Sequence, residues 1–368
     1  MPKQYKYDYL IVGAGLFGAT FAYLARQAGK TCLVIDEREH IGGNCYTEDV
    51  DGITIHRYGP HIFHTRNKKI WEFVHKFAKF NSFRYRVKAY RDGKFYSFPI
   101  NLMTMHEVWG VKDPVEAKEY LKKVTSQEFG RESANLKDWC INNVGVELYN
   151  FFVDAYTTKQ WGIAPEELPA SVIKRLPLRF TFSDYYFDDY EYQGIPIGGY
   201  TQMIQNMLFG IEVRCRVDYF KHCWASIQNK TIFTGRIDKF FNYEFGRLPY
   251  RSLKFYDQYW EIPDKQGIVV INYTGYDIPF TRSIEHKHFE FGNQPYTIVT
   301  QELSTSDGDP FYPVPTDENV ARYKKYKSLS LATKTTVLFG GRLAEYKYMN
   351  MDQVIESAFN LAKEEHLV

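Results

Sequence analysis

The most regular pattern of apolar residues lies at the N-terminus. Residues 7–13, YDYLIVG, form an apolar run that ends in glycine, as a buried parallel strand does. Residues 16–29 have the pattern of a helix with small residues near its start, and residues 31–36, TCLVID, predict a second strand. Strand, glycine turn, helix and strand together predict one βαβ unit of a parallel sheet.

The middle of the chain has other patterns. Helical periodicity covers residues 67–79 and much of 114–163, with two helices expected to meet near Gly145. Residues 198–210 predict a helix that is entered through glycines. Apolar and polar side chains alternate over residues 250–300, which is typical of antiparallel strands.

The C-terminal segment returns to the first pattern. TTVLFGGR predicts a buried strand that ends in a double glycine, and residues 351–366 predict a closing helix. Because the two ends of the chain share one pattern and the middle differs, we expect α/β architecture. A discontinuous Rossmann-like nucleotide-binding domain would be interrupted by an inserted helical domain and an antiparallel β-sheet domain.

The expected boundaries follow from these patterns. The nucleotide-binding domain takes residues 1–80, 196–245 and 333–368, and the helical domain takes 100–172. The antiparallel sheet domain takes the three remaining segments, which are 81–99, 173–195 and 246–332.

Composition narrows the class of protein. The chain has 46 basic and 44 acidic residues, so its net charge of +2 gives no electrostatic case for nucleic-acid binding. Five cysteines without CxxC spacing argue against a disulfide framework or a zinc site and fit a reducing cytoplasm. Residues 9–25 lack charges, like a signal peptide, but the glycines within them favour a strand, a turn and a helix. We expect no membrane insertion.

The glycines near the N-terminus have a specific spacing. Gly13, Gly15 and Gly18 form a GxGxxG pattern between the predicted strand and helix. The first permits a tight turn, the second lets the backbone approach a pyrophosphate, and the third lets helix and strand pack closely. Asp36, at the end of the next strand, can accept ribose hydroxyls. The pattern predicts a dinucleotide site.

NAD and FAD share this fingerprint, and two further glycine pairs favour FAD. Gly42-Gly43 follows the second strand, and Gly340-Gly341 lies near the C-terminus. Backbone approach at two places so far apart in sequence suits FAD, which is long and bound extended. NADPH remains open as a reductant.

Several motifs taken together resemble one family. In order along the chain they are YDYLIVGAGLFGA, HIGGNCYTED, GPHIFHT, YTTKQWG, ELPASVIKRLPLRFTF, YQGIPIGGYT, RSLKF, PFTRSIEHKHF and GGRLAEYKY followed by MDQVI. The chain resembles the UDP-galactopyranose mutases nearly from end to end. The resemblance implies an isomerase that interconverts UDP-galactopyranose and UDP-galactofuranose. Reduced FAD would supply its N5 as the nucleophile at the anomeric carbon, with no net redox change.

The resemblance also assigns residues. It implies three catalytic residues, which are Arg175 on a mobile substrate loop, Arg282 and His64. The implied cofactor-binding residues are Gly13, Gly15, Phe17, Gly18, Asp36, Glu37, Gly43, Asn44, His61, Ile62, Gly341, Arg342 and Gln353. The implied substrate-binding residues are Asn81, Phe152, Tyr156, Thr157, Trp161, Arg175, Tyr186, Arg251, Asn272, Arg282, Tyr312, Tyr346 and Tyr348. No metal is implied, and a homodimer is expected.

Some alternatives stay open. Tyr156 has a spacing that a buried helix face would also show. Asn350 stands where the family has an acidic residue, and Tyr85 stands where some members have a smaller polar one, so UDP-N-acetylgalactosamine is a second substrate to consider. Two rival classes share the N-terminal fingerprint: an FAD oxidoreductase of the amine-oxidase type, and a flavin-bound sugar-nucleotide sensor.

Overall fold

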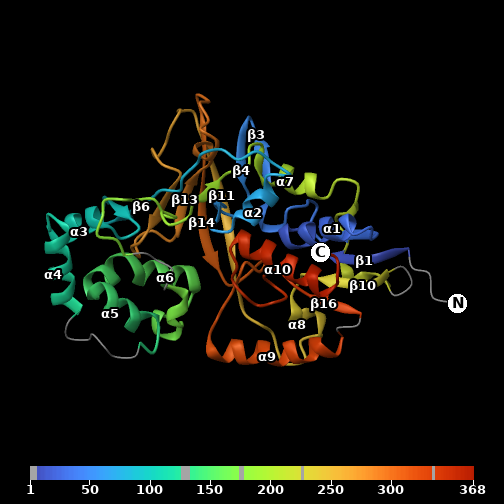
Figure 1. Cartoon of the computed structure of the whole chain (residues 1–368). Coiled ribbons are helices and arrows are strands. Elements are labelled where there is room, and N and C mark those ends of the chain that lie inside the picture. The colour runs from blue at the N-terminus through green and yellow to red at the C-terminus, as the bar shows by residue number, and fades with distance from the viewer. Residues whose placement is uncertain (1–5, 126–132, 174–177, 225–227, 334–335) are drawn as a thin grey trace.

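Five parallel strands form the first sheet of the computed structural model, which describes residues 6–125, 133–173, 178–224, 228–333 and 336–368. In spatial order the strands are β16 (Val337–Phe339), β10 (Gln228–Phe233), β1 (Tyr7–Val12), β2 (Cys32–Ile35) and β9 (Glu212–Arg214), all paired in parallel (Figure 1). The predicted βαβ unit and the C-terminal strand are confirmed. The pattern gave no sign of β10, which lies beside β1, because its first half, QNK, is polar.

Four helices cover this sheet. They are α1 (Leu16–Gln27), α2 (Lys68–Val74), α7 (Gly199–Met207) and α10 (Met351–Glu364). Helix α10 lies beside α1, so the two ends of the chain pack together (Figure 1). Its buried residues Val354, Ile355, Ala358 and Ala362 recur at helical spacing and join one core with those of α1 and α7.

The second sheet has seven strands and divides the molecule. In spatial order they are β15 (Tyr312–Pro313), β11 (Tyr250–Trp260), β14 (Thr297–Thr305), β13 (Arg282–Glu285), β12 (Val270–Tyr273), β6 (Val87–Arg91) and β7 (Lys94–Phe98). The expected antiparallel pairing is confirmed with one exception, because β12 and β6 are parallel. These two strands come from distant segments, and a long crossover permits parallel pairing.

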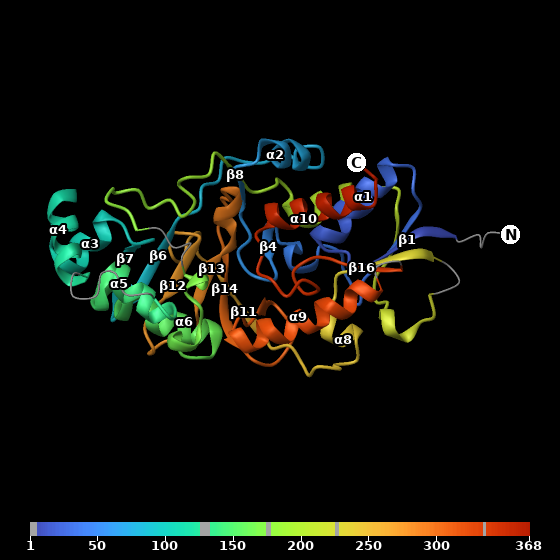
Figure 2. The same ribbon diagram turned by 60° about the horizontal axis from the view of Figure 1, so that its bottom comes forward.

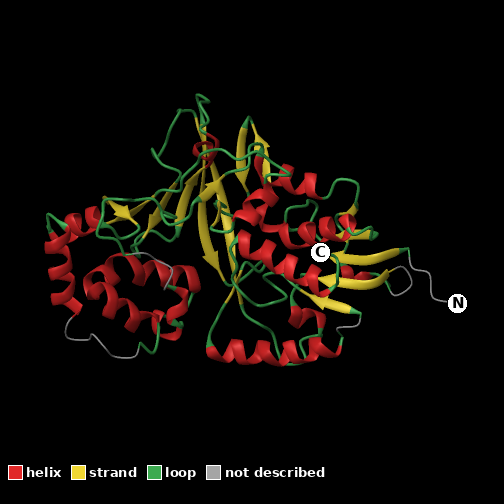
Figure 3. Cartoon of the chain, in the orientation of Figure 1, coloured by secondary structure: helices red, strands yellow, loops and turns green. Residues whose placement is uncertain are grey.

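The helices that lie between β7 and β8 in the chain gather on one side of this sheet (Figure 3). They are α3 (Leu102–Trp109), α4 (Pro114–Thr125), α5 (Leu136–Leu148), a π-helical turn (Tyr149–Val153) and α6 (Asp154–Trp161). The expected break near Gly145 is present, since this residue has φ 82° and ψ 159° within α5. Buried residues of α5 and of β6, β7 and β12 share one core, which fixes the helices against the sheet.

The remaining elements connect these parts. A hairpin joins β3 (Thr47–Val50) to β4 (Ile53–His56), and β5 (Phe63–Thr65) pairs antiparallel with the distant β8 (Tyr192–Gly194). Helix α9 (Asp317–Ala332) packs against α8 (Ile237–Phe240) and β16, although its residues were expected in the sheet domain (Figure 2). The reason is the buried ring of Tyr326, which joins Ile237 and Leu248 in a small core. The three-part division of the chain otherwise remains a proposal.

The helices are short relative to a bilayer. Within the described ranges, none combines the length and the apolar character that crossing a membrane requires.

Candidate active site

One cavity of about 1330 Å³ runs from the GxGxxG turn to the seven-stranded sheet. It brings together most of the predicted site residues from both ends of the chain. Those that line it are Gly13, Gly15, Phe17, Asp36, Glu37, Gly43, Asn44, His61, Ile62, His64, Phe152, Tyr156, Thr157, Trp161, Tyr186, Asn272, Arg282, Tyr312, Gly341, Arg342, Tyr346 and Tyr348. A single cavity thus contains both the predicted cofactor set and the predicted substrate set.

Four described residues of the predicted set lie outside the lining. Gly18 packs α1 on β1, because a Cβ there would lie 2.0 Å from the carbonyl oxygen of Gly13. The Gln353 side chain accepts a hydrogen bond from the Asn350 N–H at the start of α10. Asn81 uses its side chain on backbone groups, for example donating to the Phe289 oxygen at 2.8 Å. Arg175, the predicted loop arginine, lies outside the described residues.

Arg251 is the fourth residue outside the lining, and it holds the end of α6. Its guanidinium donates to the carbonyl oxygens of Gln160 at 3.1 Å and Lys159 at 3.4 Å. It also donates to the hydroxyls of Ser304 and Ser306, and burial lowers its pKa. Arg251 therefore supports the cavity wall from behind. The family resemblance implied instead that it contacts the substrate.

The glycine end of the cavity is built from close backbone contacts. Gly13 has φ 111°, and a Cβ there would lie 2.0 Å from the Thr234 hydroxyl. The Asp36 carboxylate accepts from the backbone N–H of Ala14 at 2.7 Å and of Arg38 at 2.9 Å. These bonds fix the carboxylate at the end of β2, where ribose hydroxyls could reach its remaining lone pairs.

The cavity also holds an arginine beside two neighbouring tyrosines. The guanidinium carbon of Arg342 lies 4.8 Å from the Tyr348 ring centroid and 5.5 Å from that of Tyr312. Among the described residues, its buried Nε meets no hydrogen-bond partner. A buried donor left unpaired in a cavity is a group that a bound molecule can satisfy. Tyr346 also lines the cavity, but its hydroxyl donates to the carbonyl oxygens of Pro249 and Val314.

Two histidines also line the cavity. His61 places Nδ1 2.8 Å from the Gly59 carbonyl oxygen, so Nδ1 carries the proton and Nε2 is an acceptor. Burial, followed by the charge of Arg342, lowers the pKa of His61 to about 4, so the ring is neutral at pH 7. His64 donates from Nδ1 to the Ile62 oxygen at 3.0 Å, and its ring stacks on Phe187 at a centroid distance of 3.6 Å.

A polar row crosses the seven-stranded sheet under the cavity. Asn272 of β12 pairs in register with Arg282 of β13, which pairs with Glu302 of β14. The Arg282 Nε donates to Glu302 Oε1 at 2.9 Å, and Thr281 Oγ1 donates to the same oxygen at 3.2 Å. Burial alone would lower the pKa of Arg282, but the Glu302 carboxylate and the nearby hydroxyls of Tyr156, Tyr312 and Tyr85 together raise this pKa well above its usual value.

Sequence reasoning missed Glu302. This residue is fully buried, and its Oε2 has no hydrogen-bond partner. One signal was available, because a lone acidic residue in a strand of buried apolar positions requires a cationic partner. Which cation it pairs with depends on the register between β13 and β14, and the sequence does not give that register.

Helix α6 forms another wall of the cavity. Tyr156, Thr157, Gln160 and Trp161 line the cavity from positions that share one face of this helix. Phe152, in the π-helical turn just before α6, adds a ring that is 2% exposed and packs on Tyr96 and Phe98. Gln160 is an addition to the predicted set, and its buried Oε1 has no partner.

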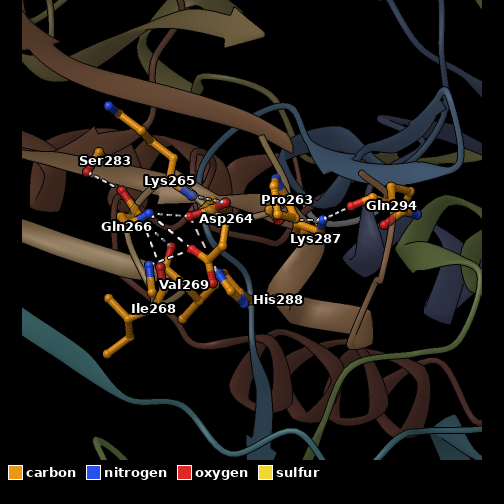
Figure 4. A network of polar contacts seen from close by, with 12 residues as sticks. Pro263, Asp264, Lys265, Gln266, Ile268, Val269, Ser283, Lys287, His288 and Gln294 are labelled. Atoms are coloured by element: carbon orange, nitrogen blue, oxygen red, sulfur yellow. Dashed lines mark hydrogen bonds and ion pairs between the residues drawn. The ribbon is translucent and has the colours of Figure 1, made fainter. Parts of the chain in front are cut away.

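A second cluster of titratable groups lies away from this cavity. His288 Nε2 is 3.5 Å from Asp264 Oδ1 and 3.4 Å from Glu285 Oε2 (Figure 4). Backbone N–H groups of the turn already donate to both carboxylates, including Lys265 to Glu285 at 2.9 Å and Gly267 to Asp264 at 2.6 Å. The cluster therefore fixes the connection between β11 and β12. The prediction that the protein binds no metal stays a prediction.

The fold and the cavity together define a class of protein. A Rossmann-like dinucleotide-binding domain is combined with a seven-stranded sheet and a helical insertion, and one cavity spans all three. A family model for an NAD(P)-binding Rossmann-like domain matches residues 11–77, in agreement with the glycine turn.

Comparison with known proteins gives the family. The model for UDP-galactopyranose mutase matches residues 151–348, and the chain belongs to this family of isomerases. It is 38% identical to dTDP-fucopyranose mutase of Escherichia coli, over 96% of this chain and 97% of that protein. It is 36% identical to a probable UDP-galactopyranose mutase of Klebsiella pneumoniae, over 96% and 94% of the two chains. A crystal structure of reduced UDP-galactopyranose mutase shares the fold with a TM-score of 0.79 at 11% identity, covering 98% of this chain and 94% of that one.

Proposed function

We propose that this protein interconverts the pyranose and furanose forms of a nucleoside-diphosphate sugar, with UDP-galactopyranose as the first candidate. The observation that carries the proposal is the single cavity, which contains a dinucleotide cradle together with Arg282, Arg342 and three tyrosines. Such a cavity can hold a cofactor and a sugar nucleotide together. The match of the mutase family model to residues 151–348 supports the same assignment.

The residues present fit FAD as the cofactor. A Cβ at Gly13 would clash with the Thr234 side chain, and one at Gly43 would lie 3.0 Å from the Gly15 Cα, so this turn requires glycines, as a turn that binds a pyrophosphate through its backbone does. Gly13, Gly15, Asp36 and Gly43 would hold the adenosine diphosphate. His61, Ile62, Gly341 and Arg342 would lie along the flavin. When bound and reduced, FAD would supply a nucleophilic nitrogen for the anomeric carbon.

The chain's own residues would bind and orient the substrate. Glu302 engages Nε of Arg282, so the terminal guanidinium nitrogens are the ones that can bind the diphosphate. The rings of Phe152, Tyr156 and Trp161 offer flat partners for the base, and Thr157 offers a hydroxyl. Neutral His61 can accept a hydrogen bond through Nε2 without adding charge. These groups would hold the anomeric carbon and neutralise the leaving diphosphate.

A second candidate substrate is dTDP-fucopyranose. It is favoured by the 38% identity to the E. coli dTDP-fucopyranose mutase over nearly the whole chain. UDP-N-acetylgalactosamine stays a third candidate, because Asn350 at the cavity replaces an acidic residue that the family resemblance leads us to expect. The homodimer and the cytoplasmic location stay predictions.

One experiment separates the candidates. The purified protein is reduced with dithionite and incubated separately with UDP-galactofuranose, dTDP-fucofuranose and the furanose form of UDP-N-acetylgalactosamine, and the products are resolved by chromatography. We expect pyranose product only from the reduced protein, and the best substrate identifies the specificity. Amine turnover with oxygen consumption would instead support an oxidoreductase. Tight UDP binding without any turnover would support a sensor.

A further inference from the structure

The side chain of Lys159 leaves α6 and ends inside the loop that joins β12 to β13. Its ammonium group lies within hydrogen-bond distance of four backbone carbonyl oxygens of that loop. These are the oxygens of Tyr273 at 2.8 Å, Gly275 at 2.8 Å, Ile278 at 2.8 Å and Phe280 at 3.0 Å. An ammonium has three N–H donors, so four converging acceptors saturate it.

In this arrangement the dipoles of peptide carbonyl groups, in place of a carboxylate counter-ion, stabilise the Lys159 charge. None of the ion pairs in the described ranges involves Lys159, although the charge of Asp277 favours its protonated form. Burial lowers the pKa of Lys159 to about 8, so the ammonium still dominates at pH 7. An ammonium group that is half-buried and bonded to four carbonyl oxygens has one strongly preferred position.

The two segments that Lys159 joins both carry walls of the cavity. Helix α6 contributes Tyr156, Thr157 and Trp161, and the loop lies between Asn272 and Arg282. Lys159 itself does not line the cavity. A second contact also joins the loop to α6, because the Tyr276 hydroxyl donates to Asp154 Oδ2 at 3.1 Å.

We propose that Lys159 is a positioning residue for the substrate, because it locks α6 to the β12–β13 loop and so fixes the base-binding wall relative to Arg282. The inference rests on the proposed function, in which the base lies against α6 and the diphosphate against Arg282. A nucleoside diphosphate must reach both walls at once. A shift of about 1 Å between binding groups can cost on the order of a hundredfold in rate or affinity.

The chain offers a matched control in Lys287. Its ammonium also donates to three backbone carbonyls, those of Pro263 at 2.6 Å, Gln294 at 2.6 Å and Tyr296 at 3.0 Å (Figure 4). Neither Lys287 nor these three residues line the cavity. Loss of Lys287 should weaken the fold locally without moving the substrate walls.

The test uses the reduced holoenzyme with Lys159→Met and Lys287→Met. KM and kcat are measured with the sugar nucleotide that the wild type turns over best, and the Kd values of UDP and dTDP are measured by calorimetry. For Lys159→Met we expect KM and Kd to rise roughly ten- to a hundredfold, the range for loss of charge-assisted hydrogen bonds. We expect kcat to change much less. Lys287→Met should keep the wild-type KM and Kd.

Two further variants keep the inference testable if Lys159→Met folds poorly. Lys159→Arg keeps the charge, but its planar fork cannot donate to four converging carbonyls, so its Kd should also rise. Lys159→Ala should regain affinity when methylammonium is added, because a free ammonium can occupy the same cage. A role confined to stability would show no such rescue.

The outcomes are distinguishable. Wild-type KM and Kd in both Lys159→Met and Lys159→Arg would overturn the positioning role, as would an equal loss of affinity in Lys287→Met. Failure of the proposed function would be seen in the wild type alone, as absence of turnover and of binding to UDP and dTDP, and the positioning role would be overturned with it.

Discussion

Arg282 and Glu302 face each other across β13 and β14, with Arg282 Nε 2.9 Å from Glu302 Oε1. Glu302 is fully buried and Arg282 is 18% exposed at its side chain. The ion pair holds the guanidinium charge of Arg282 at the cavity, and the buried Glu302 carboxylate balances this charge from the sheet below. This explains how the fold can hold a cation at the proposed diphosphate site before substrate arrives.

The first prediction concerns the stability of this pair. Glu302→Ala leaves the buried Arg282 charge without its partner, which typically costs about 3–5 kcal/mol of unfolding free energy. Urea unfolding of the two single variants and of Arg282→Ala/Glu302→Ala measures it. We expect the double variant to lose less stability than the sum of the two single losses, because each single change leaves the partner's charge unpaired and the double change removes both charges. Strict additivity would mean that the two residues are not coupled.

The second prediction concerns activity. Arg282→Ala should abolish turnover while the cofactor stays bound, since the fixed cation at the leaving diphosphate is gone. Loss of one such group typically costs about 10²- to 10³-fold in kcat. Arg282→Lys keeps a charge beside Glu302, so a correctly folded protein with reduced activity is expected. Turnover and flavin absorbance are measured together.

Its control is Arg214→Ala. Arg214 forms an exposed ion pair with Glu212 on β9 and does not line the cavity, so activity should be unchanged. Activity like that of the wild type in Arg282→Ala would refute the assignment of Arg282 to the diphosphate.

The third prediction concerns the glycine turn. Gly18→Ala places a Cβ 2.0 Å from the carbonyl oxygen of Gly13, and backbone cannot move away cheaply. We expect α1 to shift from β1, with loss of bound flavin and of stability. Gly29→Ala is the control, because a Cβ there meets nothing within 4 Å and adds only the strain of φ +75°, about 1–2 kcal/mol. Flavin per protein chain and urea unfolding are compared. Equal flavin content in the two variants would argue against the packing role of Gly18.

The fourth prediction concerns pH. The Glu285 carboxylate, 3.4 Å from Nε2, raises the pKa of His288 above its ordinary value, against the effect of burial. Because the folded pKa is the higher one, protonated His288 stabilises the fold fully below the unfolded pKa of about 6.5 and less as pH rises through the folded value. The free energy of unfolding of the wild type relative to His288→Gln should therefore be larger at pH 5.5 than at pH 8.5. An equal difference at both pH values would contradict the ion pair.

Much of the fold could be read from local patterns. The run of apolar residues before Gly13 and the glycine spacing identify β1 and α1 because strand burial, turn geometry and helix packing all depend on neighbouring residues. The break at Gly145 follows from one glycine with positive φ. By contrast, α9 has only two buried residues, Asn319 and Tyr326, and so little apolar periodicity to show.

Like the fold, the candidate site could be predicted only in part from the sequence. The motifs place most of the predicted cofactor and substrate residues, and the structure brings them to one cavity. Arg251 and Asn81 do not line this cavity, and their polar groups bond backbone behind it, so their assignment to substrate stays a prediction. A motif records that a residue type is needed at a position, but it does not say which atoms that side chain meets.

By itself, the sequence determined the dinucleotide turn and the resemblance to the UDP-galactopyranose mutases, because both lie in contiguous motifs. Only the tertiary structure decided that Glu302 holds Arg282 and that Lys159 binds the β12–β13 loop. Each of these contacts joins residues more than a dozen positions apart. They depend on strand register and on the docking of α6, which the chain settles by burying its core as a whole.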